Sequence, residues 1–207
     1  VRSADKKVAF IISVIEDITQ RKTNELLLER QRNLYDMLSL TNQAIVRFKD
    51  KDTLFTKICE IAVEHGKFLF AWFGAFDDVN EHISITHTFG DDRGFTDWIV
   101  RVNEEHPDLI RQTAAMRALK SGENLIMNNY QLQATTNPFH QKARESGIAS
   151  SAYFIIREQG KVIGSLNLYA TSADYFNDEI TNTLAEMAVD VSFALDNLRR
   201  DKKLLQS

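Results

Sequence analysis

The sequence has little of several features that would point to a particular function. Cys59 is the only cysteine among 207 residues, which excludes an intramolecular disulfide and a cysteine-based metal cluster. Acidic and basic residues nearly balance, at 29 and 25, and they are interspersed. This balance predicts no nucleic-acid partner and no polybasic membrane anchor. No apolar run approaches the roughly 20 residues of a membrane span, and no signal peptide is recognisable, so we expect a cytoplasmic segment without membrane contact.

Glycine and proline are absent between residues 20 and 48, which predicts one long helix. Its apolar residues recur at heptad-like spacing: Leu27, Leu34, Leu38, Thr41, Ile45 and Phe48. A second such run begins near Asn177 and contains Ile180, Leu184, Met187, Val191, Ala194, Leu198 and Leu205. Inside a domain these stripes would cover one face of a sheet. Residues 23–33 and 198–206, at the outer ends, are expected to pair with a second copy.

The middle of the chain alternates apolar strand patterns with helical ones. The expected order is helix 51–65, strands 68–76 and 82–89, helices 95–102 and 107–121, strand 124–127, helix 138–145, and a hairpin. Helices grouped around an antiparallel sheet define an α+β domain. With 43% hydrophobic and 26% charged residues, the composition suits one globular domain with helical extensions. A start at Val1 rather than Met predicts a fragment of a longer protein.

The hairpin in residues 147–170 is the most informative part of the sequence. Two β-rich runs meet at the polar turn 158–161, and Gly164 interrupts the second run, where a close backbone approach or a bulge is expected. Together with the following helix, this stretch resembles the C-terminal half of a GAF domain. The resemblance covers residues 32–197. It implies an antiparallel sheet of five or six strands, with the long N- and C-terminal helices on one face and a variable lid of helices and loops on the other.

A second resemblance lies at the N-terminus. The apolar run 8–15 is followed by Glu16-Asp17-Ile18-Thr19-Gln20-Arg21-Lys22, which resembles the last strand of a PAS domain and its exit motif. In that motif Asp17 and Thr19 would cap the outgoing helix with their side-chain oxygens. The expected organisation is a PAS remnant over 1–19, a linker helix over 20–48, the GAF domain over 32–197 and an outgoing helix over 198–207. Residues 1–17 are expected to fray or to pack on a neighbour.

The GAF resemblance places a ligand pocket on the sheet face away from the terminal helices, under a lid formed by residues 90–146. Arginines there would hold a carboxylate or phosphate, and aromatic rings would stack on a planar ligand. Asn128 and Asn129 stand where the family often has an acidic residue. The candidate ligand-binding residues are Trp98, Arg117, Asn128, Phe139, His140, Arg144 and Tyr153. The alternative is that these residues are polar only because the lid is partly exposed to solvent, without any role in ligand binding.

The sequence gives weaker support for a bound cofactor or for an enzymatic activity. A haem would need one histidine, by position His140 or His106, but no pair with metal-ligand spacing occurs, and the cofactor stays unknown. His87 continues the alternation of Ile83 and Ile85 and is expected to be buried and hydrogen-bonded. GAF proteins that reduce free methionine sulfoxide use a disulfide, whereas Cys59 lies on an apolar helical stripe and is expected in the core. The sequence therefore predicts no enzyme.

The GAF resemblance implies a sensory domain of a bacterial multidomain signalling protein. A small molecule in the lid pocket would shift the terminal helices of a homodimer and so change an output domain that follows in the chain. Two alternatives stay open: a dimerisation or spacer module that binds no ligand, and a sensor that carries haem or another cofactor.

Overall fold

The computed structural model describes residues 17–133 and 136–206. It divides the chain into two units, residues 1–32 and 33–207. The strand predicted over residues 8–15 lies outside the described residues. In the first unit, the carboxylate of Asp17 accepts the backbone N–H of Thr19 at 2.9 Å, where helix α1 (Thr19–Arg47) begins. The side chain of Thr19 and this backbone N–H both lower the pKa of Asp17, and the backbone hydrogen bond is the capping contact that the sequence predicts for this residue.

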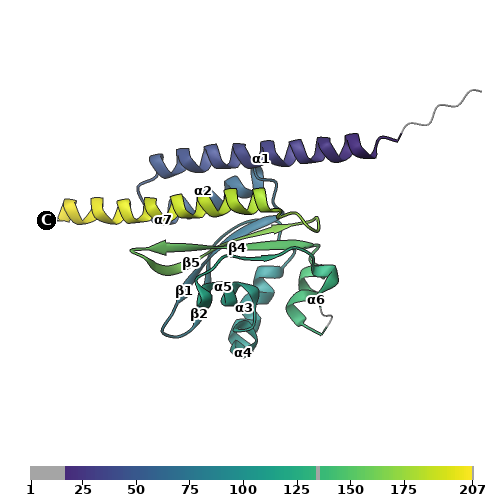
Figure 1. The fold of residues 1–207 in the computed structure, drawn as a ribbon. Coiled ribbons are helices and arrows are strands. Elements are labelled where there is room, and N and C mark those ends of the chain that lie inside the picture. Colours follow the sequence, from purple (N-terminus) through teal and green to yellow (C-terminus); the bar gives the residue numbers. More distant parts are fainter. Residues whose placement is uncertain (1–16, 134–135, 207) are drawn as a thin grey trace, which may run out of the picture. The chain divides into compact units, whose positions relative to one another are not determined.

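The second unit is built on a sheet of five antiparallel strands, in the order β2-β1-β5-β4-β3. Its strands are β1 (Phe70–Asp77), β2 (His82–Gly90), β3 (Leu125–Met127), β4 (Ser150–Glu158) and β5 (Lys161–Ala170). Helices α2 (Lys51–Glu64) and α7 (Asp178–Gln206) cover one face, with the part of α1 from residue 33 (Figure 1). The other face carries α3 (Phe95–Glu105), α4 (Pro107–Ile110), α5 (Ala114–Ser121), η1 (Tyr130–Leu132) and α6 (Pro138–Glu145). The predicted α+β class and its two differently covered faces are confirmed.

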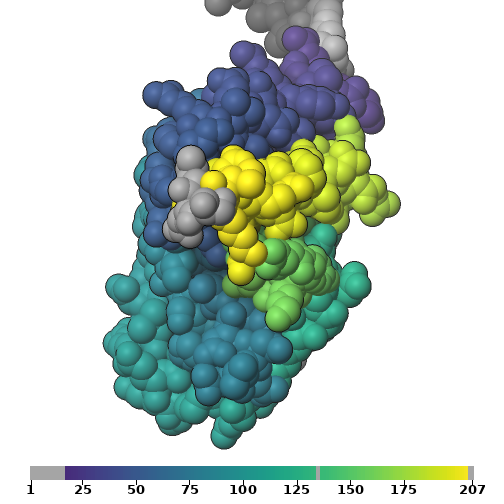
Figure 2. All heavy atoms as spheres, turned by 90° about the vertical axis from the view of Figure 1, so that its left-hand side faces the viewer, coloured from purple at the N-terminus to yellow at the C-terminus, as the bar shows by residue number. Residues whose placement is uncertain are grey.

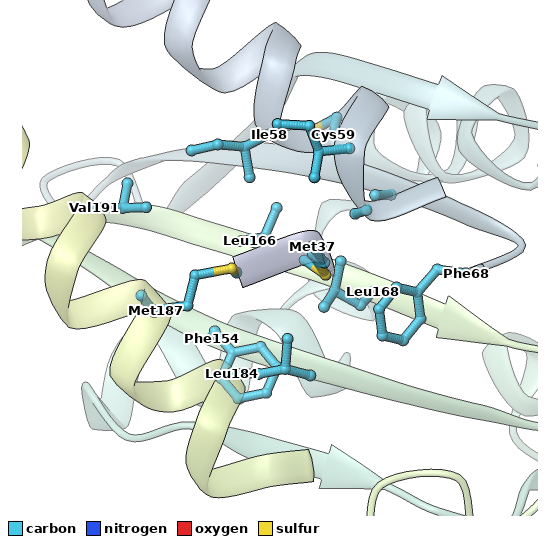
Figure 3. Close-up of a cluster of buried hydrophobic side chains, with 14 of the residues drawn as sticks. Met37, Ile58, Cys59, Phe68, Phe154, Leu166, Leu168, Leu184, Met187 and Val191 are labelled. Atoms are coloured by element: carbon cyan, nitrogen blue, oxygen red, sulfur yellow. The ribbon is translucent and has the colours of Figure 1, made fainter. Parts of the chain in front are cut away.

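The core under α2 and α7 follows from the two periodicities of strand and helix. Alternate strand residues such as Phe154, Leu166 and Leu168 point to this side and are fully buried. Residues of α7 at helical spacing meet them, and Met37 of α1 lies between the residues of α2 and those of α7 (Figure 3). Viewed from its C-terminal end, α7 lies against the blue segment of the chain, with the teal elements of the other layer below (Figure 2). Each fully buried side chain of this size contributes roughly 1.5–3 kcal/mol.

The buried stripe of α1 is Leu34, Met37, Thr41 and Ala44, at spacings of three, four and three. The heptad-like series in the sequence named Leu34 and Thr41 but also Leu38 and Ile45, which are only partly buried at the edge of this core. A straight helix turns once per 3.6 residues, so a strict heptad series drifts away from the buried face. Met37 and Ala44, which were not in the predicted series, therefore make part of the contact with the core.

One predicted helix is two helices in the structure. Residues 107–121 form α4 and α5, and the break lies at Thr113. The Thr113 hydroxyl accepts the backbone N–H of Met116 at 3.2 Å and donates to the carbonyl of Ile110 at 2.8 Å. A threonine side chain that bonds the backbone in this way begins a new helix rather than continuing the old one.

A β-bulge changes the direction of one histidine. The pairing of β1 with β2 slips by one residue, because Phe73 is opposite His87 whereas Gly74 is opposite Ile85. Thr86 is therefore the extra residue of the bulge, and the alternation of the strand is interrupted there. Ile85 packs on the side of the lid helices, whereas His87 lies against the rings of Phe55 and Phe73 on the side of α2.

The side chain of His87 is 13% exposed. Its Nδ1 lies 2.9 Å from the hydroxyl of Thr86, and its Nε2 lies 3.7 Å from the carboxylate of Asp52. Burial lowers the pKa of His87, and Asp52 opposes part of that effect. The sequence correctly predicts a largely buried, hydrogen-bonded histidine, but its place on the face of Ile83 was wrong because the bulge was not foreseen.

Candidate functional site

A cavity of about 290 Å³ lies between the sheet and the lid helices α3 to α6, on the face away from α7. The strands supply its floor with Trp72, Ile83, Met127, Tyr153 and Tyr169. The lid supplies the remaining lining: Phe95, Ile99, Ile110, Gln112, Thr113, Ala114, Ala115, Arg117, Tyr130, Gln133, Asn137, Phe139 and His140. The volume lies at the small end of the range for ligand sites, and the lining combines apolar side chains with polar groups, as expected for a small-molecule site.

The floor is polar because polar residues occupy alternate positions of the two central strands. Ser151 and Tyr153 of β4, and Asn167 and Tyr169 of β5, face the lid while the residues between them pack under α7. All four are 4% exposed or less. Asn167 is held by its own strand and by β1, since its amide donates to the carbonyl of Trp72 at 3.3 Å. Buried polar groups of this kind persist where they are hydrogen-bonded.

Three hydroxyl groups form a closed triangle at the floor. The Tyr130 hydroxyl lies 2.7 Å from the Ser151 hydroxyl and 3.2 Å from that of Tyr153, and Ser151 donates to Tyr153 at 3.0 Å. Each hydroxyl can donate one proton around the triangle and keep a lone pair for another donor. The triangle joins η1 in the lid to β4 in the sheet, so it fixes the lid while offering acceptors to a ligand.

The phenols of the floor stay neutral. Burial raises the pKa values of Tyr130 and Tyr153 well above the usual range for tyrosine, and a neighbouring phenol adds to the rise, Tyr153 for Tyr130 and Tyr169 for Tyr153. Burial likewise raises the pKa of Tyr169. These residues therefore act as hydrogen-bonding groups rather than as bases.

Aromatic rings pack in a continuous layer beneath and beside the cavity. The Tyr169 ring stacks on Phe70 at 4.2 Å between centroids and meets Tyr153 edge-on at 6.1 Å. In the lid, Trp98 meets the ring of Phe139 edge-on at 5.2 Å. These are the favoured geometries of aromatic pairs, and they hold the lining rings in fixed orientations.

The structure brings together four of the seven candidate residues from the sequence. Arg117, Phe139, His140 and Tyr153 line the cavity. His140 rests edge-on against the ring of Tyr130 at 5.7 Å. The other three do not line the cavity. Trp98 packs edge-on against Phe139, Arg144 donates to the backbone carbonyl of Tyr130 at 2.8 Å, and Asn128 binds the segment that precedes α7.

Asn128 makes a two-sided clasp with Phe176. Its amide N–H donates to the carbonyl of Phe176 at 2.8 Å, and its amide oxygen accepts the N–H of Phe176 at 3.0 Å. The carbonyl of Asn128 also accepts the N–H of Asp174 at 2.7 Å. This clasp connects the end of β3, beside the cavity residue Met127, to the start of α7.

Trp72 and Tyr169 are cavity residues that sequence reasoning missed. For Tyr169 a signal existed, because Ser165, Asn167 and Tyr169 alternate with apolar residues, as Ser151 and Tyr153 do in the partner strand. Polar residues at alternate positions of a fully buried strand indicate a polar surface inside the protein. Trp72 gave no such signal, because both faces of β1 are buried.

Cys59 lies away from the cavity, on the other side of the sheet. Its thiol is buried in the core under α2, on the opposite side of the sheet from the cavity. Burial raises the pKa of Cys59 to about 12, which leaves the thiol protonated near neutral pH. Across residues 17–133 and 136–206 no group of three or more histidine, cysteine, aspartate or glutamate side chains is placed to hold a metal ion. No helix in the same ranges is long and apolar enough to cross a membrane.

The GAF domain family model matches residues 49–196, and the chain belongs to this family. Several solved structures share the fold at low sequence identity. Free methionine-R-sulfoxide reductase from Neisseria meningitidis, in complex with its substrate, aligns with a TM-score of 0.61 at 14% identity over 81% of this chain and 91% of its own. The GAF domain of a phosphoenolpyruvate-protein phosphotransferase from Coxiella burnetii gives 0.60 at 14% identity, over 83% and 97%.

A domain assigned to a two-component sensor histidine kinase of Sinorhizobium meliloti aligns with a TM-score of 0.56 at 14% identity, over 76% of this chain and 99% of its own. No curated protein matches the sequence. The fold therefore occurs in an enzyme as well as in domains of signalling and phosphotransfer proteins, and at these identities the similarity shows the fold alone.

Proposed function

We propose that this GAF domain is a sensory module that binds a small molecule in the lid cavity and passes the signal to its terminal helices. The observation that carries the proposal is the cavity itself, which combines a buried polar floor with apolar walls inside a domain of this family. Structural relatives in a sensor kinase and in phosphotransferases fit a regulatory role.

The sheet offers a direct route from the cavity to α7. Tyr153 and Ile155 of β4 belong to the layer that holds the cavity, whereas Phe154 and Ile156 pack in the core beneath α7. A ligand that moves β4 would therefore move the residues that support α7. The end of the strand is also fixed to the helix, because the N–H of Arg157 donates to the hydroxyl of Ser192 at 3.0 Å.

The second route runs through the lid. The Asn128 clasp binds the residue two positions before α7, and Met127 beside it lines the cavity. A ligand that changes the position of Met127 would therefore act on the first turn of α7. Both routes end on the same helix, which is why we expect α7 to be the output element.

We expect the domain to work as a homodimer through its terminal helices. In the second unit, α1 from residue 33 and α7 both expose large apolar side chains: Tyr35 (63%) and Val46 (73%) on α1, and Val189 (66%) and Phe193 (62%) on α7. Tyr35 and Val46 are eleven residues apart, and Val189 and Phe193 are four apart, so each pair lies along one helix face. Apolar stripes on long helices are typical of helix pairing between copies.

A binding role fits the chain better than catalysis by a thiol. The relative that reduces methionine sulfoxide shares the fold, but the single cysteine of this chain is buried on the far side of the sheet with a raised pKa. The neutral phenols of the floor are likewise suited to hydrogen bonding.

Ligand binding is tested by incubating the protein with a small-molecule extract and identifying by mass spectrometry what remains bound after buffer exchange. Ala115→Phe fills the cavity from α5, and the control Val100→Phe places the same ring on the exposed face of α3. We expect wild type and Val100→Phe to retain the same compound and Ala115→Phe to lose it. Equal retention by all three proteins would contradict the cavity as the binding site.

Dimerisation is tested separately by light scattering coupled to size exclusion. Phe193→Glu places a charge in the apolar stripe of α7, and Val79→Glu is a matched change at a 90% exposed apolar residue in the β1–β2 turn. We expect a dimer for wild type and Val79→Glu and a monomer for Phe193→Glu. A monomeric wild type would overturn the relay, and a dimer that retains no compound would favour the spacer module.

A further inference from the structure

The fixed charge in the lining of the cavity is of one sign only, positive. Arg117 carries the only fixed charge among the lining residues that the structure describes, and no aspartate or glutamate lines the cavity. Its basic neighbours already have acidic partners, because Lys120 pairs with Glu81 at 2.9 Å and Arg111 pairs with Asp108 at 3.1 Å. Apart from its backbone N–H, which donates to the carbonyl of Thr113, the exposed Arg117 makes no hydrogen bond, and its guanidinium makes no ion pair, with any residue of the described ranges. An unpaired guanidinium at a ligand cavity favours an anion, which it can hold in a bidentate contact.

Two helices begin at the same cavity. Thr113, Ala114 and Ala115 form the start of α5, and Asn137 and Phe139 form the start of α6. In α6 the cap Asn137 accepts two backbone N–H groups. In α5 the cap accepts only that of Met116, so the N–H groups of Ala114 and Ala115 have no acceptor within the described residues. Free N–H groups in a first helical turn add to the attraction for negative charge.

The floor supplies an independent sign of a missing partner. The indole nitrogen of Trp72 is buried, with the side chain 2% exposed, and it has no hydrogen-bond acceptor within the described part of the chain. The Tyr169 hydroxyl is near enough that the indole opposes part of the rise in the pKa of that phenol caused by burial, but the two groups do not meet the geometry of a full hydrogen bond. A buried N–H without an acceptor costs about 1–3 kcal/mol. An oxygen on the ligand would remove that cost, and the hydroxyl triangle beside it has lone pairs for a ligand donor.

Part of the cavity wall is apolar and partly aromatic. Phe95 and Phe139 contribute rings, and Ile99 and Ile110 contribute branched aliphatic groups. At about 30 Å³ per water-sized group, a cavity of 290 Å³ has room for roughly ten non-hydrogen atoms. That is the size of one aromatic ring with two small substituents.

From these observations we infer that the ligand is a single-ring aromatic carboxylate with a second oxygen substituent on the ring. The carboxylate would bind Arg117 and the start of α5, the ring would lie between the apolar walls, and the second oxygen would accept from Trp72 at the floor. This inference rests on the proposed ligand-binding function and adds the class of ligand to it.

The inference is tested with three probes of one shape, 4-hydroxybenzoate, the neutral 4-hydroxybenzamide and the cationic 4-hydroxybenzylamine, titrated by calorimetry. Because a hydrogen bond to a charged group is worth about 1.5–3 kcal/mol, we expect the acid to bind at least about tenfold more tightly than the amide, and the amine not to bind. Arg117→Gln should abolish the preference for the acid and leave binding of the amide unchanged. The control Arg101→Gln, on α3 outside the cavity, should change neither.

The outcomes separate the ligand class from the function. Equal affinity for the acid and the amide, or a preference for the acid that survives in Arg117→Gln, would overturn the carboxylate class and leave small-molecule binding in place. Binding of the acid that persists unchanged in Ala115→Phe would place the site elsewhere and overturn the proposed function with it. Absence of binding by all three probes would overturn the ligand class, while retention of another compound from the extract would still support the function.

Discussion

Asn128→Ala should destabilise the domain by more than the partial exposure of the Asn128 side chain suggests. The side chain makes two hydrogen bonds to the backbone of Phe176, which is 3% exposed, at 2.8 and 3.0 Å. Alanine leaves a backbone N–H and a carbonyl without partners, and each such group costs about 1–3 kcal/mol when buried. Since Asn128 itself is only half-buried and admits some water, we expect a total loss of about 2–4 kcal/mol.

The control for this prediction is the neighbouring residue. Asn129 accepts one N–H, from the exposed Gln131 at 3.0 Å, so Asn129→Ala should cost only about 0.5–1 kcal/mol. Asn128→Asp keeps the acceptor for Phe176 but turns the donor into an anion facing the carbonyl oxygen, so it should be at least as damaging as alanine near neutral pH. Urea unfolding with an unchanged m value measures all three. A loss for Asn128→Ala within 0.5 kcal/mol of that for Asn129→Ala would refute the clasp.

Two further predictions concern other parts of the fold. A Cβ at Gly164 would overlap the carbonyl oxygen of Gly74 and the ring of Phe73, so Gly164→Ala should cost more than about 2 kcal/mol in urea unfolding. Gly160→Ala, at φ +76° in open space, should cost only about 1–2 kcal/mol, and equal losses would contradict the close approach. Because burial raises the pKa of Cys59 from 9.0 to about 12, the unfolded chain loses this proton first as pH rises through 9, so stability should fall, by at most about 1.4 kcal/mol per pH unit. Denaturation at pH 8, 9 and 10 should show a shallower fall for Cys59→Ala, and identical slopes would show that Cys59 does not contribute.

Local patterns predicted the elements of the fold well. The polar turn at residues 158–161 and the close backbone approach at Gly164 are both present. Each depends on residues a few positions apart, so the sequence alone contains the information. The break at Thr113 was missed because threonine fits both a helix interior and a cap, and only the contacts of its hydroxyl decide between them.

The candidate site was harder to predict because it depends on distant residues. Asn128 and Phe176 are 48 positions apart, so no local pattern showed that the amide would bind backbone rather than ligand. The bulge at Thr86 depends on the register of β1 with β2, and it decided the side of the sheet on which His87 lies. Tyr130 meets Ser151 only because η1 folds over β4. Arg117, Phe139, His140 and Tyr153 were found because the lid and the hairpin were placed correctly.

The most direct test of the account is native mass spectrometry of the purified wild type and Ala115→Phe, each incubated with 4-hydroxybenzoate. The account predicts dimers for both proteins, with one added ligand mass per subunit for wild type and none for the variant. Wild-type dimers without added mass would contradict the proposed ligand class, and wild type and variant with the same added mass would contradict ligand binding in the lid cavity. Monomers of both proteins would contradict the relay through the terminal helices.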